Sequence, residues 1–254
     1  ETGVGVLVTR PRTQAAELVT AIEAQGGEAW CFPVLEIRPF DELDIKNSVT
    51  HLRKPDIVIF VSRNAVEYGI DYAGDADIAV IGPATARAVA AAGRVVNIQP
   101  ADGFDSEHLL AEERLQDVAG QRVRIIRGSN GRELLADELN RRGASIDYLS
   151  VYERRLPEVS ADTAAALEAR WRDGGISVVT VMSVQSWNNL LALLPAWCAA
   201  QLPDTPLVTP AARVLKEVLD RFPAARPILA SGPGADDMVQ AIIALRNTDS
   251  GIAP

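Results

Sequence analysis

Small, hydroxylic or cationic residues directly follow several short apolar runs, at points where a buried strand would end. Ser62 and Ser183 follow two such runs, and Arg10 and Arg127 follow two others. Turns that open helices present free backbone N–H groups, which bind carboxylates well. Ser and Thr are also preferred helix N-caps, so capping alone is the alternative for each hydroxyl. The residues that we expect to bind a ligand are Arg10, Ser62, Thr85, Arg127, Gly128, Ser183 and Thr209.

Tyr152 is an unusual polar aromatic residue, because it lies in the charged segment 150–156 (SVYERRL), close to Arg154 and Arg155. This segment reads as an extended ribbon. Two interpretations are open for the side chain. Either the phenol takes part in chemistry, or the ring packs on one domain as part of an amphipathic ribbon.

Motifs for nucleotide, metal and nucleophilic chemistry are missing. The segment 127–134 (RGSNGREL) has two glycines but contains neither GxxxxGK[ST] nor GxGxxG. His51 and His108 stand in polar helical contexts that predict surface residues, so no Ser-His-Asp set can be assembled. Cys31 and Cys198 lie neither in a CxxC pair nor near a histidine. We therefore expect no metal and no cofactor.

Composition narrows the class of protein further. Of the 254 residues 48% are hydrophobic, and the formal net charge is −9. A general nucleic-acid binder needs a basic surface, so we expect no nucleic-acid partner. No stretch approaches the ~20 apolar residues of a membrane span, and no signal peptide is visible. Two cysteines outside any motif fit a reducing compartment, so we expect a cytoplasmic protein. We also expect a monomer.

Apolar runs alternate with segments of helical periodicity along the whole chain. Helices separated by such short runs indicate βα units around a parallel sheet, which predicts an α/β fold. The predicted strands are 4–9, 29–32, 57–60, 78–81, 95–98, 123–126, 146–149, 177–181, 207–208 and 228–230. The predicted helices are 13–25, 64–72, 84–92, 105–115, 132–142, 163–172, 187–194, 213–222 and 236–245.

An internal repeat predicts two similar domains. The segment 56–66 (DIVIFVSRNAV) resembles 177–187 (SVVTVMSVQSW), and Ser62 and Ser183 stand at the same place in the two copies. Because the complete middle block separates two parts of the other copy, one domain is inserted into the other. We expect a discontinuous domain of 1–35 with 155–254, an inserted domain of 40–149, and an antiparallel two-stranded connecting ladder of 33–39 and 150–156.

Six segments in chain order carry a wider pattern. They are TRP at 9–11, FPVLEIRP at 32–39, DIVIFVSRNAV at 56–66, IGPATARAV at 81–89, FDSEHLL at 104–110 and IIRGSNGRELLADELNRRGASIDYLSVYER at 125–154. In this order and spacing they resemble the uroporphyrinogen-III synthase family. The resemblance implies two flavodoxin-like α/β domains with parallel sheets, one inserted into the other and joined by a two-stranded β-ladder.

The resemblance also implies a reaction and its substrate. Hydroxymethylbilane would be closed to uroporphyrinogen III with inversion of ring D and loss of water, a cyclising hydro-lyase step of tetrapyrrole (haem) biosynthesis. Loss of hydroxide leaves a resonance-stabilised azafulvene cation, so the substrate supplies most of the reactivity. The protein's part is mainly orientation, and a phenol could assist the leaving hydroxide as a general acid.

Matched to the family's motifs, Tyr152 in VYER is the expected catalytic acid. Ser62 in FVS and Thr85 in GPATA match positions of the substrate cleft. The C-terminal half departs from the pattern, because many relatives have a second GPTTA-like motif where this chain has VTPAAR. Ala211 or Ala212 stands where a threonine is expected, and Thr209 is a partial replacement.

Two other functions stay open from the sequence. A two-domain small-molecule binding or sensor module would share the layout and needs no catalytic residues. An inactive paralogue of the synthase would keep the motifs and serve a regulatory role. Assay of the protein with fresh hydroxymethylbilane separates both from an enzyme.

Overall fold

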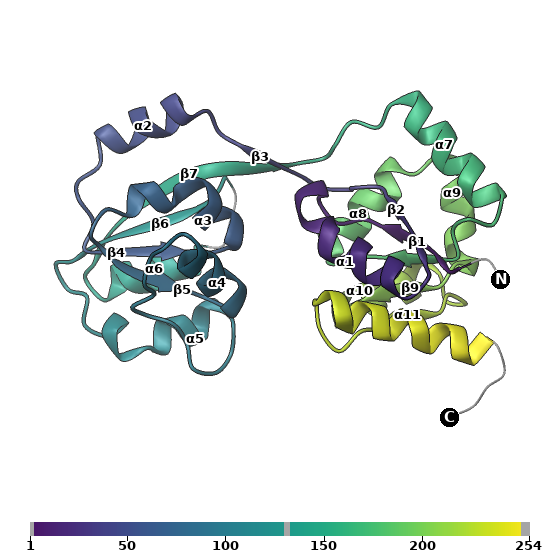
Figure 1. Cartoon of the computed structure of the whole chain (residues 1–254). Helices are drawn as coiled ribbons and strands as arrows, with labels where there is room; N and C mark the ends of the chain where they lie inside the picture. The colour runs from purple at the N-terminus through teal and green to yellow at the C-terminus, as the bar shows by residue number, and fades with distance from the viewer. Residues whose placement is uncertain (1–2, 130–132, 250–254) are drawn as a thin grey trace. The chain divides into compact units, whose positions relative to one another are not determined.

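The computed structural model describes residues 3–129 and 133–249, with side chains described up to residue 245. The chain divides into two compact units. Unit 1 comprises Glu1–Glu36 and Arg155–Pro254, and unit 2 comprises Ile37–Arg154. Along the chain, unit 2 is therefore inserted into unit 1 (Figure 1). None of the helices in the described ranges combines the length and apolar character that a membrane crossing demands.

Unit 1 is a parallel sheet wrapped by helices. In its described part, the strands lie in the order β10-β9-β8-β1-β2, and each neighbouring pair is parallel. Read from β2, this is the flavodoxin-like order. The elements are β1 (Gly5–Val8), α1 (Arg12–Ala24), β2 (Glu28–Cys31), α7 (Ala161–Arg172), β8 (Val178–Thr180), α8 (Val184–Leu193), α9 (Ala196–Gln201), β9 (Leu207–Thr209), α10 (Ala212–Arg221), β10 (Pro227–Leu229) and α11 (Ala235–Asp249).

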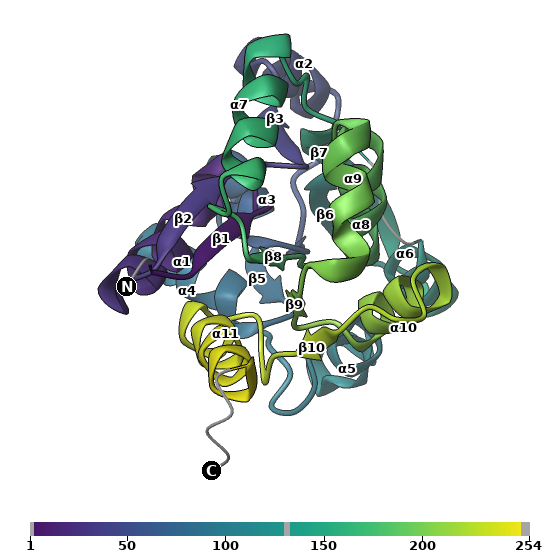
Figure 2. The same ribbon diagram turned by 90° about the vertical axis from the view of Figure 1, so that its right-hand side faces the viewer.

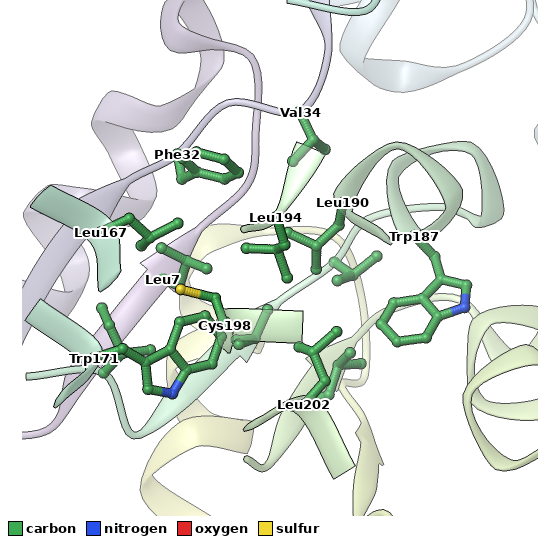
Figure 3. Close-up of a cluster of buried hydrophobic side chains, with 14 of the residues drawn as sticks. Leu7, Phe32, Val34, Leu167, Trp171, Trp187, Leu190, Leu194, Cys198 and Leu202 are labelled. Atoms are coloured by element: carbon green, nitrogen blue, oxygen red, sulfur yellow. The ribbon is translucent and has the colours of Figure 1, made fainter. Parts of the chain in front are cut away.

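Helices cover both faces of this sheet, because alternate side chains of each strand point to opposite faces. Val6 and Val8 of β1 pack with residues of α1 and α11 in one core. Leu7 packs into the other core, against α7, α8, α9 and α10 (Figure 2). Trp171 and Trp187 are among the large side chains that fill this second core (Figure 3). A strand buried on both faces explains the continuous apolar run at the start of the chain.

Unit 2 contains the second sheet, with the strand order β3-β7-β6-β4-β5 in its described part. The pairs β7–β6, β6–β4 and β4–β5 are parallel. Its elements are β3 (Glu36–Pro39), α2 (Glu42–Thr50), β4 (Ile57–Phe60), α3 (Arg63–Gly69), β5 (Asp77–Val80), α4 (Pro83–Ala91), α5 (Ser106–Ala111), β6 (Arg122–Gly128), α6 (Leu134–Arg141) and β7 (Ser145–Arg155). Val58 and Phe60 face a core with α2, α3 and α4, whereas Ile57 and Ile59 face a core with α5 and α6.

The two sheets have the same spatial order once the predicted repeat is followed. The repeat matches β4 with β8, and each of these strands is central in its sheet. Strand β5 then matches β9, while β6 and β7 match β1 and β2. The matched βα units come last in unit 2 but first in unit 1, because unit 2 is inserted after β2. The fold class predicted from the sequence, two α/β units with parallel sheets, is confirmed.

Several predicted elements differ from those of the structure. The predicted strand 95–98 contributes only a single bridge, between Ala79 and Ile98. The Asn97 side chain accepts the Ile78 N–H at 2.8 Å, in place of the backbone of a full strand. The predicted strand 146–149 and the extended segment that follows it form one strand, since β7 runs without a break from Ser145 to Arg155. The predicted helix 132–142 begins at Leu134 in the structure, and residue 132 lies outside the described residues.

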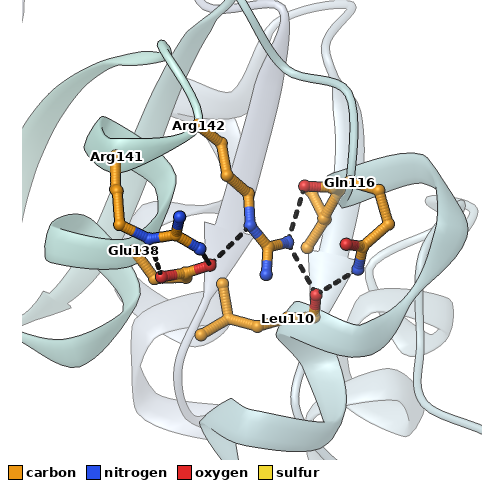
Figure 4. Close-up of polar contacts among 6 residues, drawn as sticks. Leu110, Gln116, Glu138, Arg141 and Arg142 are labelled. Carbon is orange, nitrogen blue, oxygen red and sulfur yellow. Dashed lines mark hydrogen bonds and ion pairs between the residues drawn. The ribbon is translucent and has the colours of Figure 1, made fainter.

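The predicted helix 105–115 is also too long, because α5 ends at Ala111 and a short 3₁₀ turn follows. The carbonyl of Leu110 accepts hydrogen bonds from Arg142 Nη1 and Gln116 Nε2, each at 2.7 Å (Figure 4). These side chains replace the backbone donor of a longer helix. Arg142 is paired in turn with Glu138 of α6 at 2.8 Å, so α5 is tied to α6. Helices α2 and α9 were not predicted.

Candidate active site

Three strands of unit 2 place small residues in one row at the carboxyl edge of the sheet. Phe60 of β4 is in register with Val80 of β5 and with Ile126 of β6. Two residues beyond each of these come Ser62, Gly82 and Gly128. Adjacent strands lie about 4.8 Å apart, so these residues leave the sheet as neighbours. The carboxyl edge is where open α/β sheets bind ligands.

Ser62 and Tyr152 form a pair of hydroxyls at this edge. Ser62 Oγ lies 3.1 Å from Tyr152 Oη, and either oxygen can donate. The same Oγ accepts the N–H of Ala65 at 3.1 Å, so Ser62 also caps α3. The capping interpretation of Ser62 is therefore confirmed, and the contact with Tyr152 adds a second polar partner. Ser62 is half-buried, so its hydroxyl is the member of the pair within easier reach of a ligand.

Tyr152 is buried, although charged residues follow it in the sequence. Only 2% of the residue is exposed, and it belongs to the core of unit 2. Its ring lies 6.3 Å from the ring of Tyr68, centroid to centroid. Packing of the ring on one domain, the second of the two interpretations, thus describes its surroundings. The hydroxyl bond to Ser62 leaves chemistry at the phenol open as well.

Gly128 leaves room for the Tyr152 ring because it has no side chain. A Cβ at position 128 would lie 2.8 Å from an atom of this ring, closer than Cβ atoms occur. The register between β6 and β7 shifts here, so that Arg127 pairs with Ser150 and Gly128 with Tyr152. The shift leaves Val151 without a partner on β6, while its carbonyl accepts the N–H of Phe40 at 3.1 Å. Both Val151 and Tyr152 are buried. Gly128 was expected to bind the ligand, and the structure shows that it also makes room for the Tyr152 ring.

Arg127 is engaged within unit 2 itself. Its two terminal nitrogens each donate to Glu133 Oε1 at 3.1 Å, and its guanidinium lies 3.8 Å from the centroid of the Tyr148 ring. Tyr148 Oη donates a hydrogen bond to Glu133 Oε2. The expected carboxylate partner of Arg127 is thus supplied by the chain. An external carboxylate would have to displace Glu133 to reach the terminal nitrogens.

The pKa values of this cluster follow from its contacts. Burial, and then the hydrogen bond to Glu133, raise the pKa of Tyr148 to about 12. The hydrogen bonds from Tyr148 and Arg127 hold the pKa of the Glu133 carboxyl below its usual range. Each group therefore keeps its ordinary charge state around neutral pH, with a neutral phenol and an ionised carboxylate.

A Glu133→Gln variant should lower the pKa of Tyr148 from about 12 toward the ordinary value of about 10. The carboxylate that disfavours the phenolate is removed, while the Arg127 cation that favours it remains. The absorbance of tyrosinate, followed against pH, measures the pKa of Tyr148. In the variant, one of the four tyrosines should ionise at a lower pH than in the wild type. An unchanged titration curve would show that Glu133 does not govern this phenol.

Thr85 is buried in the first turn of α4 and donates its backbone N–H to the Gly82 carbonyl at 3.1 Å. Helix α4 starts with Gly82 as N-cap and Pro83 as its first residue, without a side-chain cap. This start lies beside the start of α3 at the same sheet edge. The structure thus brings the segment of Thr85 to the row that holds Ser62.

In unit 1 the predicted residues follow the same edge but have local partners. Arg10 Nη2 donates to the Pro233 carbonyl at 2.6 Å. Ser183 caps α8 by accepting the Ser186 N–H at 3.1 Å. Thr209 is fully buried, and its Oγ1 accepts the Ala211 N–H at 3.2 Å. Capping therefore describes Ser183, whereas Thr209 holds the backbone just before α10, whose N-cap is Ala211.

The described residues contain no group of three or more His, Cys, Asp or Glu side chains placed to hold a metal ion. Cys31 and Cys198 are both free thiols. His51 and His108 are exposed, as predicted. What remains at the edge of unit 2 is a set of hydroxyls, helix starts and one neutralised arginine, which suits binding and proton donation.

Comparison with known proteins shows to which family the chain belongs. Residues 16–240 match the protein family described as uroporphyrinogen-III synthase HemD. The chain belongs to the uroporphyrinogen-III synthase family. It is 31% identical to the uroporphyrinogen-III synthase of Escherichia coli (strain K12) over 201 residues, which cover 76% of this chain and 80% of that relative.

Solved structures of synthases share the fold. A uroporphyrinogen-III synthetase from Helicobacter pylori 26695 matches with a TM-score of 0.64 at 12% identity, covering 96% of this chain and all of the other. A mutant uroporphyrinogen III synthase from the extremely thermophilic bacterium Thermus thermophilus matches with a TM-score of 0.60 at 17% identity and the same coverage. These likenesses concern the fold, and they agree with the two α/β units.

Reasoning from the sequence missed Glu133 and Tyr148, which complete the Arg127 cluster of this synthase-family chain. Glu133 lies six residues after Arg127 and directly before α6, so no helical spacing links the two. Tyr148 sits in β7, the strand that pairs with the strand of Arg127. The contact between Arg127 and Tyr148 could have been inferred from the pairing of their two strands, because Tyr148 and Ser150, the partner of Arg127, point to the same face of β7.

Proposed function

We propose that this chain is a uroporphyrinogen-III synthase, a cyclising hydro-lyase that converts hydroxymethylbilane into uroporphyrinogen III and water with inversion of ring D. The family match over residues 16–240 is the observation that carries the proposal. The hydroxyl pair at the edge of unit 2 agrees with it, since the reaction needs orientation and a weak acid more than a metal or a nucleophile.

In the first step the bond between the hydroxymethyl carbon and its oxygen breaks. The oxygen leaves as water, taking one proton, and an azafulvene cation remains on the substrate. Tyr152 is only 2% exposed, so its phenol reaches the leaving oxygen through Ser62. Ser62 Oγ donates its proton to the leaving oxygen and accepts the proton of Tyr152. A positioned general acid of this kind contributes typically ~10²–10⁴-fold to a rate.

Ring closure then depends on how the chain of pyrroles is held. The substituted α-carbon of ring D attacks the cationic carbon and gives a spiro intermediate. The bond from that α-carbon to the methylene shared with ring C then breaks, and the methylene bonds to the free α-carbon of ring D. The proton of that carbon returns through Ser62 to the Tyr152 phenolate, which yields the inverted product and restores the acid. Acetate and propionate groups of the substrate meet backbone N–H groups at the starts of α3 and α4, near Ser62 and Thr85. Arg10, Arg127, Ser183 and Thr209 are kept as candidate binding residues, and Gly128 supports Tyr152.

The remaining parts of the proposal concern organisation. Units 1 and 2 act as domains of 1–35 with 155–254 and of 40–149, connected by the segments 33–39 and 150–156. The neighbouring positions of β3 and β7 in one sheet support this. The enzyme acts as a cytoplasmic monomer without a metal, a cofactor or a nucleic-acid partner, and the two free thiols agree with a reducing compartment.

Incubation of the purified protein with fresh hydroxymethylbilane tests the function. Separation of the type I and type III isomers of the oxidised product is the measurement. Type III product well above the level without protein is expected, because inversion needs an enforced substrate fold. Product of type I alone, at the rate without protein, would contradict the proposal and favour a binding module or an inactive paralogue.

A further inference from the structure

Phe104 is the one phenylalanine, tyrosine or tryptophan that is exposed in the described structure, and the others are buried or half-buried. The exposed fraction of Phe104 is 63%. Exposing a large aromatic side chain forgoes the free energy that its burial would contribute. An exposed aromatic residue at a ligand-binding edge therefore points to a ligand that covers it.

The ring stands next to the row of strand ends described above. A Cβ at Gly82 would lie 3.6 Å from Phe104 Cβ and 4.0 Å from its Cγ. Gly82 is the N-cap of α4 and the neighbour of Ser62 across the β4–β5 pair. Phe104 thus emerges at the same sheet edge as the hydroxyl pair and the segment of Thr85.

The backbone around Phe104 is firmly held. Gly103 has a φ of +74°, and a Cβ there would lie 2.3 Å from the His108 ring, so this position needs glycine. Asp105 caps α5 by accepting the His108 N–H at 2.9 Å, and the same carboxylate lies 2.5 Å from His108 Nδ1. Through Arg142, α5 is fixed to α6 as well (Figure 4). The ring is thus presented from a well-defined turn.

A local packing role does not account for the exposure. Phe104 precedes the N-cap Asp105, so a hydrophobic staple with Leu109 would be its ordinary role. Leu109 is fully buried, yet the Phe104 ring stays largely outside that core. A staple would have covered it.

We propose that Phe104 is a substrate-positioning residue whose ring stacks on a pyrrole ring of the linear tetrapyrrole. This inference rests on the proposed function and deepens it. A pyrrole is flat and electron-rich, and aromatic pairs in offset or edge-to-face contact gain free energy beyond that of area burial. Stacking next to Ser62 and Thr85 would fix one ring of the substrate while the chain folds back for closure.

The test compares Phe104→Ala with Phe104→Trp and with a matched control, Leu43→Ala. Leu43 belongs to unit 2, lies in α2 and is 64% exposed, so its loss removes a similar exposed apolar surface elsewhere. Initial rates give kcat and KM for hydroxymethylbilane, the isomer ratio is recorded, and calorimetry gives the Kd for uroporphyrinogen III without oxygen. Thermal unfolding checks that each variant is folded.

Phe104→Ala should raise KM and Kd about tenfold with a smaller change in kcat, which corresponds to the loss of one aromatic contact. Phe104→Trp should restore both, and Leu43→Ala should change neither. Equal constants for Phe104→Ala and the wild type, or the same loss in Leu43→Ala, would overturn the inference while leaving the synthase function in place. A wild-type chain that binds but does not react would contradict the proposed function alone. A wild-type chain that does neither overturns both.

Discussion

A Tyr152→Phe variant should form uroporphyrinogen III up to about 10²-fold more slowly than the wild type, with the type III isomer still the main product. The substitution keeps the ring that packs between Gly128 and Tyr68 and removes only the hydroxyl bonded to Ser62. General acids contribute ~10²–10⁴-fold, and we expect the low end or less, because the substrate is prone to lose hydroxide by itself. Inversion is retained because it depends on how the substrate is folded.

Initial rates at several substrate concentrations, with separation of the isomers, measure this effect. Tyr72→Phe is the matched control, since Tyr72 is a half-buried tyrosine that packs against the same core. It should react at the wild-type rate. If Tyr152→Phe also has the wild-type rate at every substrate concentration, Tyr152 is structural, and the acid is a water molecule or the substrate.

Removal of the Asp147 carboxylate should destabilise unit 2 by about 3–5 kcal/mol. Arg124 of β6 is buried, with 3% of its side chain exposed, and its Nε donates to Asp147 Oδ1 at 2.7 Å. Its Nη2 donates to the Arg53 carbonyl at 2.8 Å. In Asp147→Ala the guanidinium loses its counter-charge while it stays in the interior, and an uncompensated buried charge is costly.

The distribution of aromatic residues allows the stability of each unit to be measured separately. All four tryptophans lie in unit 1, and all four tyrosines lie in unit 2. In denaturant unfolding, Asp147→Ala should shift the transition seen by tyrosine absorbance far more than the one seen by tryptophan fluorescence. The exposed pair of Lys54 and Asp75 supplies the control, because Asp75→Ala should leave both transitions in place. Equal, small shifts for the two variants would show that the Arg124 pair is not critical.

The parallel α/β architecture was predictable because its strands are short, apolar on both faces and separated by helical segments. The position of the Ser62 and Thr85 hydroxyls at one edge of the sheet was predictable as well, since parallel strands bring their carboxyl ends to the same edge. The predicted strand 95–98 failed because the Asn97 side chain takes over a backbone hydrogen bond. Such replacement depends on a tertiary contact that no periodicity reveals.

Burial of Tyr152 was not predictable from its neighbours. Alternation would place Val151 and Tyr152 on opposite faces of β7, with one of them among the charged residues that follow. The register shift beside Gly128 lets both be buried, and only the missing side chain of this glycine makes room for the ring. The Arg127 cluster escaped prediction likewise, because its members come from β6, β7 and the start of α6.

A double-variant cycle of Ser62 and Tyr152 tests most directly whether the two hydroxyls act as one proton donor. The rate of type III formation is measured for wild type, Ser62→Ala, Tyr152→Phe and the double variant. Ser62→Ala also removes the N-cap of α3, which costs about 0.5–2 kcal/mol of stability, so Ser62→Thr is included to keep a hydroxyl in that place. Residues that act as a unit show strong coupling.

We expect the double variant to be no slower than the slower of the two single variants, with Ser62→Thr close to wild type. That result would mean that loss of either hydroxyl breaks the same proton path. If the two rate losses multiply in the double variant, Ser62 and Tyr152 act independently, and the path from Tyr152 through Ser62 to the substrate is contradicted.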